Sequence, residues 1–443
     1  MAGTPADEHF EREVWRHYRY NFTVHVIEGG LVWFGFGCAA ISTILPTYLS
    51  LLTRSKLLIV LPQHLFYASW SMTMLFVAYI VQRYRTRKGP CVAYGVAVRL
   101  MMVVWGVTAL ATKRYGAVVG LVGVYAGLLS LMVSAGPSEL CWCDLTSRII
   151  PRERRGRFFG ARQLVGVAAG VAAAWLVYAL IGPADQARPE QFGVPFLIGA
   201  AAFAASLPLV AITREPVHPD PPPRAQGYWA YLLHAVDVLR RNVPFRRYVL
   251  IRTATGLTGL FAAGLFAPYA REQFGISART ISGPFTTVMV ISQIASGPAL
   301  GWLADRRGYR LVFAFAVACG ACASLVGLTL PLWPSPAMGF AICYAFAGMG
   351  GTAMFMATFN MTFEFAGVHS RSLYIAIAST LPAPVFVAAG AAGGLLVDHV
   401  GFVPALAASA VIHLAVAALV VWLLPEPRHL PHVEPPFTRP IRA

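Results

Sequence analysis

The feature that most limits what this chain can fold into is a series of apolar runs, each about 20 residues long, that recurs along the whole sequence. The run at 118–136, VVGLVGVYAGLLSLMVSAG, contains no charged residue. Soluble helices keep one polar face, whereas these segments are apolar all round, as helices in lipid are. Lipid offers no partners to an open sheet edge, and the runs are too long for barrel strands. We therefore expect an all-α integral membrane protein.

Charged or Pro/Gly-rich joints separate the apolar runs and predict twelve transmembrane helices. We expect them near 24–51, 57–82, 90–112, 115–137, 158–182, 192–213, 248–270, 280–303, 309–331, 337–360, 372–397 and 402–424. The two halves of this series resemble each other, because the sixth run ends with TREP (213–216) and the twelfth with LPEP (424–427). An internal repeat is the usual construction of a secondary transporter, and it predicts two six-helix pseudo-symmetric bundles.

The segments between and beyond the runs complete the expected domain organisation. We expect an N-terminal bundle, a cytoplasmic linker, a C-terminal bundle and a cytoplasmic tail at 24–213, 214–247, 248–424 and 425–443. Within the linker, YWAYLLHAVDVLRR (228–241) predicts an amphipathic helix on the inner membrane surface. Residues 1–23 lack the apolar core and cleavage site of a signal peptide, and they form either a short interfacial helix or a frayed tail.

The distribution of lysine and arginine predicts the orientation in the membrane. The formal net charge is +16, with 35 lysines and arginines. When both termini are placed in the cytoplasm, 25 of them fall in cytoplasmic segments, 7 in outer segments and 3 in spans. This bias follows the positive-inside rule. We therefore expect a multi-pass protein of the plasma membrane, which is the inner membrane in a bacterium. The positive charge is then a topology signal, and we expect no nucleic-acid partner.

The sequence offers little for catalysis or for a cofactor. The 7 cysteines lie in or beside apolar runs, and CGAC (319–322) has CxxC spacing without polar context, so it predicts helix packing. No Ser/His/Asp order, metal-ligand cluster or pair of catalytic carboxylates stands out. No strand precedes a phosphate-binding loop with a Lys-Ser/Thr pair. We expect neither enzyme activity nor a metal or other cofactor.

Charge interrupts the apolar pattern in GWLADRRGYR (301–310), between the eighth and ninth runs. The residues that form the pattern are Gly301, Leu303, Asp305, Arg306, Gly308 and Arg310. In this pattern, and in its span count, linker and repeat, the chain resembles a major facilitator superfamily (MFS) transporter. That family carries a G-x-x-x-D-[RK]-x-G-x-[RK] loop between spans 2 and 3, often repeated between spans 8 and 9. The first-half segment AYIVQRYRTRK (78–88) has Gln82 where the Asp would be and lacks both glycines.

The resemblance implies alternating access, with a solute site near mid-membrane between the two bundles. Spans 1, 4, 7 and 10 would line that site, and spans 2, 5, 8 and 11 would face the other bundle. On this basis we expect a monomeric secondary transporter of a small organic solute in the lipid bilayer, coupled to protons. The alternative is a sensor or assembly partner of the same fold that carries no flux, which the degraded loop at 78–88 mildly favours.

The loop at 301–310 predicts a gating brace on the cytoplasmic side. Glycine allows close backbone approach, and an Asp at a helix end accepts charge-assisted bonds from arginine or faces a helix N-terminus. A contact made in one state and broken in another would bias the equilibrium by about 1–3 kcal/mol. Alternatively, the arginines only mark the cytoplasmic side, and the Asp is solvated. By resemblance, two further pairs would act as latches or be solvated in the same way: Asp144 with Arg155, and Glu364 with Arg371.

Two charged residues inside expected spans are candidates for the solute or coupling site. Glu28 lies about one to two turns into the first span, and Arg99 lies roughly 13 Å into the third. A lone charge at a helix centre costs about 2.5–3.5 kcal/mol on insertion, so such residues usually pair or face a wet cavity. We expect Glu28 to be a proton-coupling or substrate-binding carboxylate, with Arg99 as a candidate partner. The alternatives are a structural Glu–Arg pair, or a Glu28 that reaches the interface.

The other polar positions in the runs have two interpretations each. Gln293 and Asn360 would present hydrogen bonds to a cavity or join helices. Arg162, near the inner surface, is explained by topology, and Asp398, at the outer end of the eleventh run, is expected to be solvated. Three histidines would either carry protons or pack as satisfied side chains: His25, His64 and His413.

Overall fold

The structure is a computed structural model, and it describes residues 5–81, 84–183, 186–217, 227–365 and 371–426. In these residues every regular element is a helix. The first half contains α1 (Pro5–Cys38), α2 (Ile44–Leu52), α3 (Lys56–Met72), α4 (Met74–Val81), α5 (Lys88–Tyr115), α6 (Ala117–Ile149), α7 (Arg155–Leu180) and α8 (Gly193–Ala211). The second half contains α9 (Tyr228–Arg241), α10 (Val243–Thr255), α11 (Phe266–Phe274), α12 (Ala278–Thr280), α13 (Thr286–Arg307), α14 (Tyr309–Thr329), α15 (Pro336–Phe365), α16 (Arg371–Thr380), α17 (Pro382–Val400) and α18 (Phe402–Leu423).

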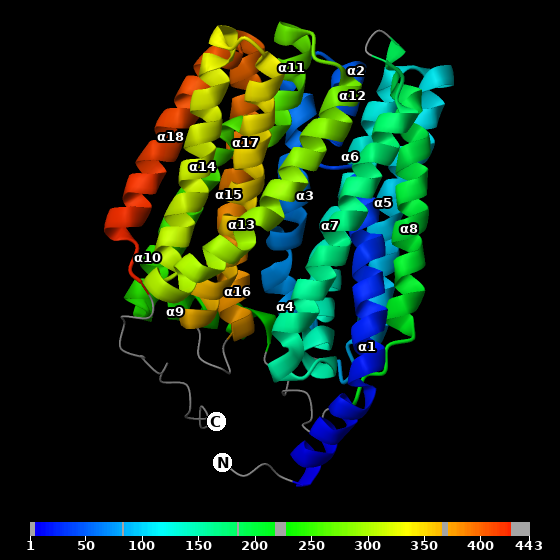
Figure 1. Ribbon diagram of the computed structural model, residues 1–443. Helices are drawn as coiled ribbons and strands as arrows, with labels where there is room; N and C mark the ends of the chain where they lie inside the picture. Colours follow the sequence, from blue (N-terminus) through cyan, green and yellow to red (C-terminus); the bar gives the residue numbers. More distant parts are fainter. Residues whose placement is uncertain (1–4, 82–83, 184–185, 218–226, 366–370, 427–443) are drawn as a thin grey trace.

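The described residues contain 10 helices that are long and apolar enough to cross a membrane. They coincide with the third to the twelfth expected runs. The first two runs are interrupted: the first is divided between α1 and α2, and the second is divided at Thr73 into α3 and α4. The charged segment at the N-terminus is neither separate nor frayed from Pro5 onward, because α1 continues from Pro5 to Cys38 without a break and extends below the bundle (Figure 1).

Two expected ends are too early. The fourth run was expected to end at 137, but α6 continues to Ile149, and the tenth was expected to end at 360, but α15 continues to Phe365. The apolar run marks only the part of a helix that lipid covers. A helix continues past that boundary when its polar side chains find partners, as Asp144 and Arg148 do on α6.

The helices pack in two sets. In the first set (α1 to α8), α5 packs along α6 and α8, and α1 packs along α7 and α8. In the second set (α10 to α18), α14 packs along α15 and α18, and α13 packs on α15. The sets meet where α3 lies along α17, where α4 meets α16, and where α7 meets α13. In Figure 1 most of the second set, yellow to red, lies on the left, and most of the first lies on the right.

Small residues allow the two sets to approach closely along α17. A Cβ at Gly390 would come within 2.4 Å of the His64 ring, and one at Gly394 within 2.5 Å of the Leu57 backbone. A Cβ at Gly393 would lie only 1.6 Å from the Leu260 carbonyl oxygen. Larger side chains at these positions would push α17 away from α3 and from the 3₁₀ segment η4 (Gly256–Phe261).

The two ends of the bundle carry different helices. We call the end where α1 begins and α18 ends the terminal side, which is the lower end in Figure 1, and the end that carries α2 and α11 the opposite side. The predicted linker helix is present as α9 on the terminal side. On one face Ala235 and Val238 are buried, whereas on the other Trp229 is 76% exposed. The ring of Tyr228 contacts that of Tyr79 of α4, so α9 also touches the first set.

Candidate functional site

The embedded part of the site is built around Glu28 of α1, which is buried. Its Oε2 accepts a hydrogen bond from Nη2 of Arg162 of α7 at 2.9 Å. The same oxygen lies 3.9 Å from Nδ1 of His25, whose Nε2 lies 2.9 Å from the hydroxyl of Thr213 beyond α8. Gly29 makes the pair possible, because a Cβ there would come within 2.5 Å of the Arg162 side chain. A buried carboxylate needs such a partner, since an unpaired buried charge is strongly destabilising.

Arg162 connects this pair to α6. Its guanidinium carbon lies 4.3 Å from the centre of the Trp142 ring, in a cation–π contact. Its Nε is buried and has no hydrogen-bond partner among the described residues. Glu139, one turn before Trp142, is half-buried, accepts a hydrogen bond from the Cys143 thiol, and lies within electrostatic range of both Arg162 and Glu28. Glu28 is therefore the carboxylate bonded to Arg162, and Glu139 is a second carboxylate near the same arginine.

The expected pairing of Glu28 with Arg99 is not what the structure shows. Arg99 of α5 donates to the carbonyl oxygens of Gly95 and Phe203 and, at 2.7 Å, to the hydroxyl of Ser206 on α8. Its guanidinium also lies 4.6 Å from the centre of the Phe203 ring. Arg99 thus ties α5 to α8 through neutral groups. Arg162, which topology had explained, is the actual partner of Glu28.

On the terminal side of the first set, Asp144 of α6 binds two arginines. Arg87, just before α5, donates from Nε to Asp144, and Arg148 donates from Nη2 at 3.3 Å. The predicted pairing of Asp144 with Arg155 is therefore wrong. Arg155 instead donates to the carbonyl oxygens of Ser147 and Ile150 and so fastens the turn between α6 and α7. Arg87, which binds Asp144, lies in the first-half segment AYIVQRYRTRK (78–88), so this segment fastens α5 to α6 within the first set.

A second carboxylate, Glu215, caps α5 from the end of the sixth run. It accepts from the backbone N–H of Arg87 at 2.8 Å and of Lys88 at 3.0 Å, and its side chain is 3% exposed. The N–H groups at a helix start have no intrahelical partner and face the positive end of the helix dipole, so a carboxylate is favourable there. The contact joins the exit of α8 to the start of α5.

The second set repeats this cap with Glu426. Its Oε2 accepts from the backbone N–H of Arg310 at the start of α14 at 2.9 Å. Gly308 has φ +85°, and a Cβ there would come within 2.3 Å of the Glu426 carboxyl group. This glycine is therefore required twice, by its left-handed backbone and by the approach of the carboxylate. Glu215 and Glu426 are the third residues of the repeated segments TREP and LPEP. The repeat therefore marks both capping carboxylates in the sequence, but it does not predict which helix each of them caps.

The other members of the predicted brace have different surroundings. Gly301 is not a point of close approach, because a Cβ there would meet open space. Asp305 and Arg306 are exposed, and the Arg306 guanidinium lies 4.6 Å from the centre of the Trp302 ring on the same helix. Glu364 is half-buried near the end of α15, whereas the side chain of Arg371 lies outside the described residues. The predicted latch between these last two stays a prediction.

Gln293 of α13 and Asn360 of α15 are both half-buried. The carbonyl oxygen of Gln293 accepts from the Thr352 hydroxyl at 2.8 Å, which joins α13 to α15. Asn360 donates to the Met356 carbonyl oxygen of its own helix at 2.7 Å. Their roles in a solute site stay predictions.

A group of charged residues that sequence reasoning missed joins the two sets on the opposite side. Asp398 of α17 accepts from the backbone N–H of Lys56 at 2.7 Å and from the hydroxyl of Ser55 at 2.9 Å, so it caps α3. Lys56 Nζ lies 2.9 Å from Oε1 of Glu272 of α11, and Arg271 donates to the hydroxyl of Ser50. Asp398 is exposed, as expected of a solvated side chain, but it also makes this cap, which the expectation did not include. We call these residues the clasp.

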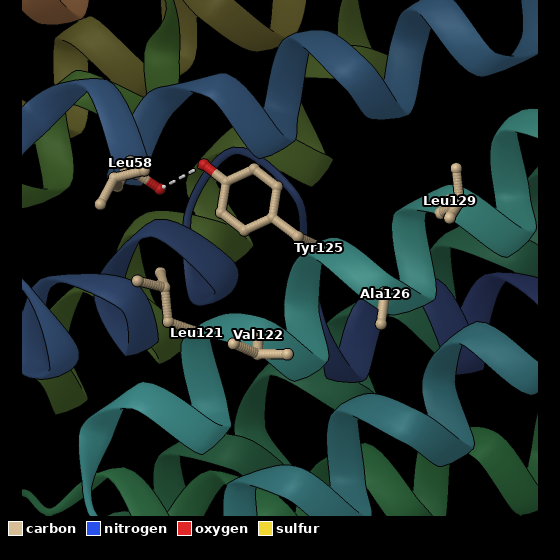
Figure 2. A pocket seen from close by; sticks show the side chains of 6 residues that line it. All are labelled: Leu58, Leu121, Val122, Tyr125, Ala126 and Leu129. Atoms are coloured by element: carbon tan, nitrogen blue, oxygen red, sulfur yellow. Dashed lines mark hydrogen bonds between the residues drawn. The ribbon is translucent and has the colours of Figure 1, made fainter.

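A hollow in the described part of the chain lies away from these charges. Figure 2 shows it between α3 and α6, with a volume of about 400 Å³, lined by Leu58, Leu121, Val122, Tyr125, Ala126 and Leu129. The Tyr125 hydroxyl donates to the Leu58 carbonyl oxygen at 3.2 Å. That carbonyl would otherwise lack its partner in the α3 ladder, because Pro62 has no N–H. With its polar group used in this way and Leu129 65% exposed, the hollow suits lipid chains rather than a polar solute.

Comparisons with known proteins identify the family and the fold. The family model described as Major Facilitator Superfamily matches residues 141–381 and 253–443. A D-xylose–proton symporter is similar in structure, with a TM-score of 0.68, 13% identity, and coverage of 93% of this chain and 99% of that one. The nucleoside transporter NupG (D323A mutant) has a TM-score of 0.66 and 11% identity, with coverage of 90% of this chain and 99% of that one. The xylose transporter XylE from E. coli, in a partially occluded inward open conformation, has a TM-score of 0.65 and 12% identity, with coverage of 94% of this chain and 99% of that one. No curated protein matches the sequence. At these identities the structures show a shared fold.

Proposed function

Because this chain belongs to the major facilitator superfamily, we propose that it is a secondary transporter that carries a small organic solute across the membrane by alternating access, coupled to protons. On this proposal α1 with α2 and α3 with α4 are the first two spans, which brings the total to twelve in two six-helix bundles at 24–213 and 248–424. The terminal side is cytoplasmic, in agreement with the arginines that gather there, such as Arg87 and Arg148.

The observation that carries the proposal is the pair Glu28–Arg162. An ion pair that only held two helices together would need one carboxylate for its arginine. Here Glu139 also lies within electrostatic range of Arg162. Protonation of Glu28 weakens its bond to the guanidinium, whose Nε already has no hydrogen-bond partner in the described part of the chain. A solute oxygen can occupy those N–H groups. Exchange between a proton and a solute at one site is the basis of coupling.

The packing of the two sets supports the alternating-access part of the proposal. They meet along helices whose contacts use small residues, as at Gly390 and Gly394, and such faces can part and meet again without large side-chain rearrangements. The clasp joins the sets on the opposite side, which is the outer side in this orientation. On this proposal, opening toward that side requires these bonds to break, and the arrangement with these bonds formed corresponds to an outward-closed state.

Reconstitution into liposomes tests the function. An imposed proton gradient should drive accumulation of at least one solute from a panel of sugars, nucleosides, short peptides and amino acids. Glu28→Gln should reduce gradient-driven accumulation at least tenfold while it preserves solute exchange without a gradient. Glu11→Gln provides the matched control, because Glu11 lies on the same helix and is exposed, and it should behave as the native protein.

Two results would overturn parts of the proposal. If no solute moves with or without a gradient, the chain is a non-transporting member of the fold, a sensor or an assembly partner. If accumulation and its pH dependence survive in Glu28→Gln at normal expression, the carboxylate has no coupling role, and the pair with Arg162 is structural.

A further inference from the structure

His64 of α3 has hydrogen-bond geometry that a neutral histidine cannot satisfy. Its side chain is fully buried. Nδ1 lies 3.0 Å from the carbonyl oxygen of Val60, and Nε2 lies 2.9 Å from the carbonyl oxygen of Gly259. A carbonyl oxygen only accepts, and a neutral imidazole has one N–H and one lone pair. In the neutral form, one nitrogen would therefore point its lone pair at an oxygen, whereas the imidazolium donates to both.

The other two histidines in the expected spans do not face this conflict. His25 Nε2 lies 2.9 Å from the hydroxyl of Thr213, which donates its own proton to the Leu209 carbonyl oxygen, so one N–H on Nε2 satisfies this contact. Nδ1 lies 3.9 Å from Glu28, which is beyond hydrogen-bond distance. His413 Nδ1 lies 2.8 Å from the carbonyl oxygen of Ser409 on its own helix, so one N–H on that nitrogen satisfies the contact. Both arrangements suit a neutral ring. Among the buried histidines of the described spans, His64 is thus the one whose partners require a second proton.

The contacts of His64 also cross between the two sets. Val60 belongs to α3, but Gly259 belongs to η4, the 3₁₀ segment between α10 and α11 in the second set. Phe386 of α17 lies against the imidazole with a centroid distance of 4.4 Å, and Gly390 leaves space for the ring. Separation of the sets at this point would remove the Gly259 carbonyl and the Phe386 ring together. One neutral histidine bond to Val60 would then be enough.

Val60, Gly259, Phe386 and Gly390, which lie against the ring, carry no titratable side chain, and the two bonds of the ring go to backbone carbonyl oxygens and not to an acid. The titratable or charged groups nearest along the packed elements are Tyr67 and Lys56 of α3, Arg252 of α10 and Asp398 of α17. Lys56 and Asp398 are each eight residues from the contact positions on their own helices, roughly 12 Å along the axis, and both belong to the clasp. Burial disfavours a cation here, and two charge-assisted bonds and the face of Phe386 offset that cost.

We propose that His64 takes up a proton when the two sets close on the opposite side and releases it when they part, so that closure and protonation are one event. The uptake itself requires only this conformation; its use in solute coupling rests on the proposed function. The sign of the linkage follows directly: a state that binds one more proton is favoured as the pH falls. The ratio of closed to open molecules can then change by up to tenfold per pH unit.

The experiment measures opening as a function of pH. Thr43 is fully buried, and its Oγ1 accepts from Thr286 of the second set at 2.7 Å, so a cysteine placed there reacts only when the sets part. In a Thr43→Cys, Cys143→Ser protein in nanodiscs, the labelling rate should rise as the pH rises. His64→Gln should remove most of this pH dependence, and His413→Gln should keep it.

The outcomes separate this inference from the proposed function. If His64→Gln keeps the native pH dependence, or if the native protein shows none, the inference is overturned, whatever the transport assay gives. If the pH dependence is lost in His64→Gln but no solute is carried, His64 is a proton-dependent latch in a protein that does not transport. Should His64→Gln fail to fold, ¹⁵N spectra of histidine-labelled native protein decide. A rigid imidazole with both nitrogens protonated at neutral pH supports the inference, and its absence overturns it.

Discussion

The two ends of the molecule place their charged contacts in different relations to the two sets of helices. On the terminal side, Asp144 and Glu215 bind partners in the first set, and Glu426 binds a partner in the second. On the opposite side, Asp398 and Lys56 bind partners across the sets. Charge therefore stabilises each set internally at one end and joins the sets at the other. A change at the terminal side should affect stability, and a change at the opposite side should affect opening.

The largest expected effect is that of Gly308→Ala on stability. A backbone with positive φ and extended ψ, as at Gly308, costs a non-glycine residue about 1–3 kcal/mol, and displacement of the Glu426 cap adds about 1 kcal/mol, so we expect a loss of about 2–4 kcal/mol. The midpoint of thermal unfolding in detergent measures it. Gly301→Ala is the matched control and should be neutral or slightly stabilising, because its Cβ enters open space in a helix. Equal midpoints for the two variants would show that the Glu426 cap of the second set does not contribute to the stability of the fold.

A smaller loss is expected when either cap loses its charge. Glu215→Gln and Glu426→Gln keep the shape of the side chain but remove its interaction with the helix N-terminus, at a cost of about 1 kcal/mol each. Hydrogen exchange at the first turns of α5 and α14 should speed up in the respective variant. Labelling of Thr43→Cys should stay at the native rate in both. A faster labelling rate would mean that the caps also control opening, and the contrast between the two ends would be lost.

The smallest effect on stability is expected at the exposed part of the clasp. In the Lys56–Glu272 pair the Lys56 side chain is 9% exposed and the Glu272 side chain 39%, so water still screens the pair, and we expect it to contribute about 0.2–1 kcal/mol. Lys56→Met should leave the unfolding midpoint nearly unchanged, yet it should raise the labelling rate of Thr43→Cys by a factor of about 2–5, as such an energy allows. Lys113→Met is the control, because Lys113 is exposed on the same side but outside the clasp. If both lysine variants label alike, the pair does not hold the sets together.

Much of the fold was accessible from the sequence because lipid imposes one simple rule. Apolar runs of sufficient length must be helical, and ten of the twelve expected runs coincide with helical stretches long and apolar enough to cross a membrane, although the seventh is divided between α10 and α11 and the eleventh between α16 and α17. The rule does not predict where a helix is interrupted inside a run, as at Thr73. Hydropathy depends on side chains, so it does not change where the backbone leaves the helical path and its polar groups find local partners. It also misses helical turns outside the lipid, as in α6 beyond residue 137.

The site was less accessible because its pairs are far apart in the sequence. Glu28 was recognised as a buried charge, but its partner Arg162 lies 134 residues away, and hydropathy cannot distinguish it from a topology arginine. Glu215 was visible as part of the repeated TREP and LPEP segments, yet the cap it makes depends on how α8 ends beside α5. For Asp398 there was no sequence signal, since a charge at the end of a run is usually solvated.

Distances between spin labels test the central claim most directly, which is that the clasp joins two sets that otherwise move as rigid units. One label pair spans the sets on the opposite side, at Arg114 and Leu332, and a second pair lies within the first set, at Arg54 and Arg114; all three residues are exposed. In Asp398→Ala, the cross-set distribution should shift to longer distances while the distribution within the set stays the same. An unchanged cross-set distribution, or an equal change in both, would contradict the account.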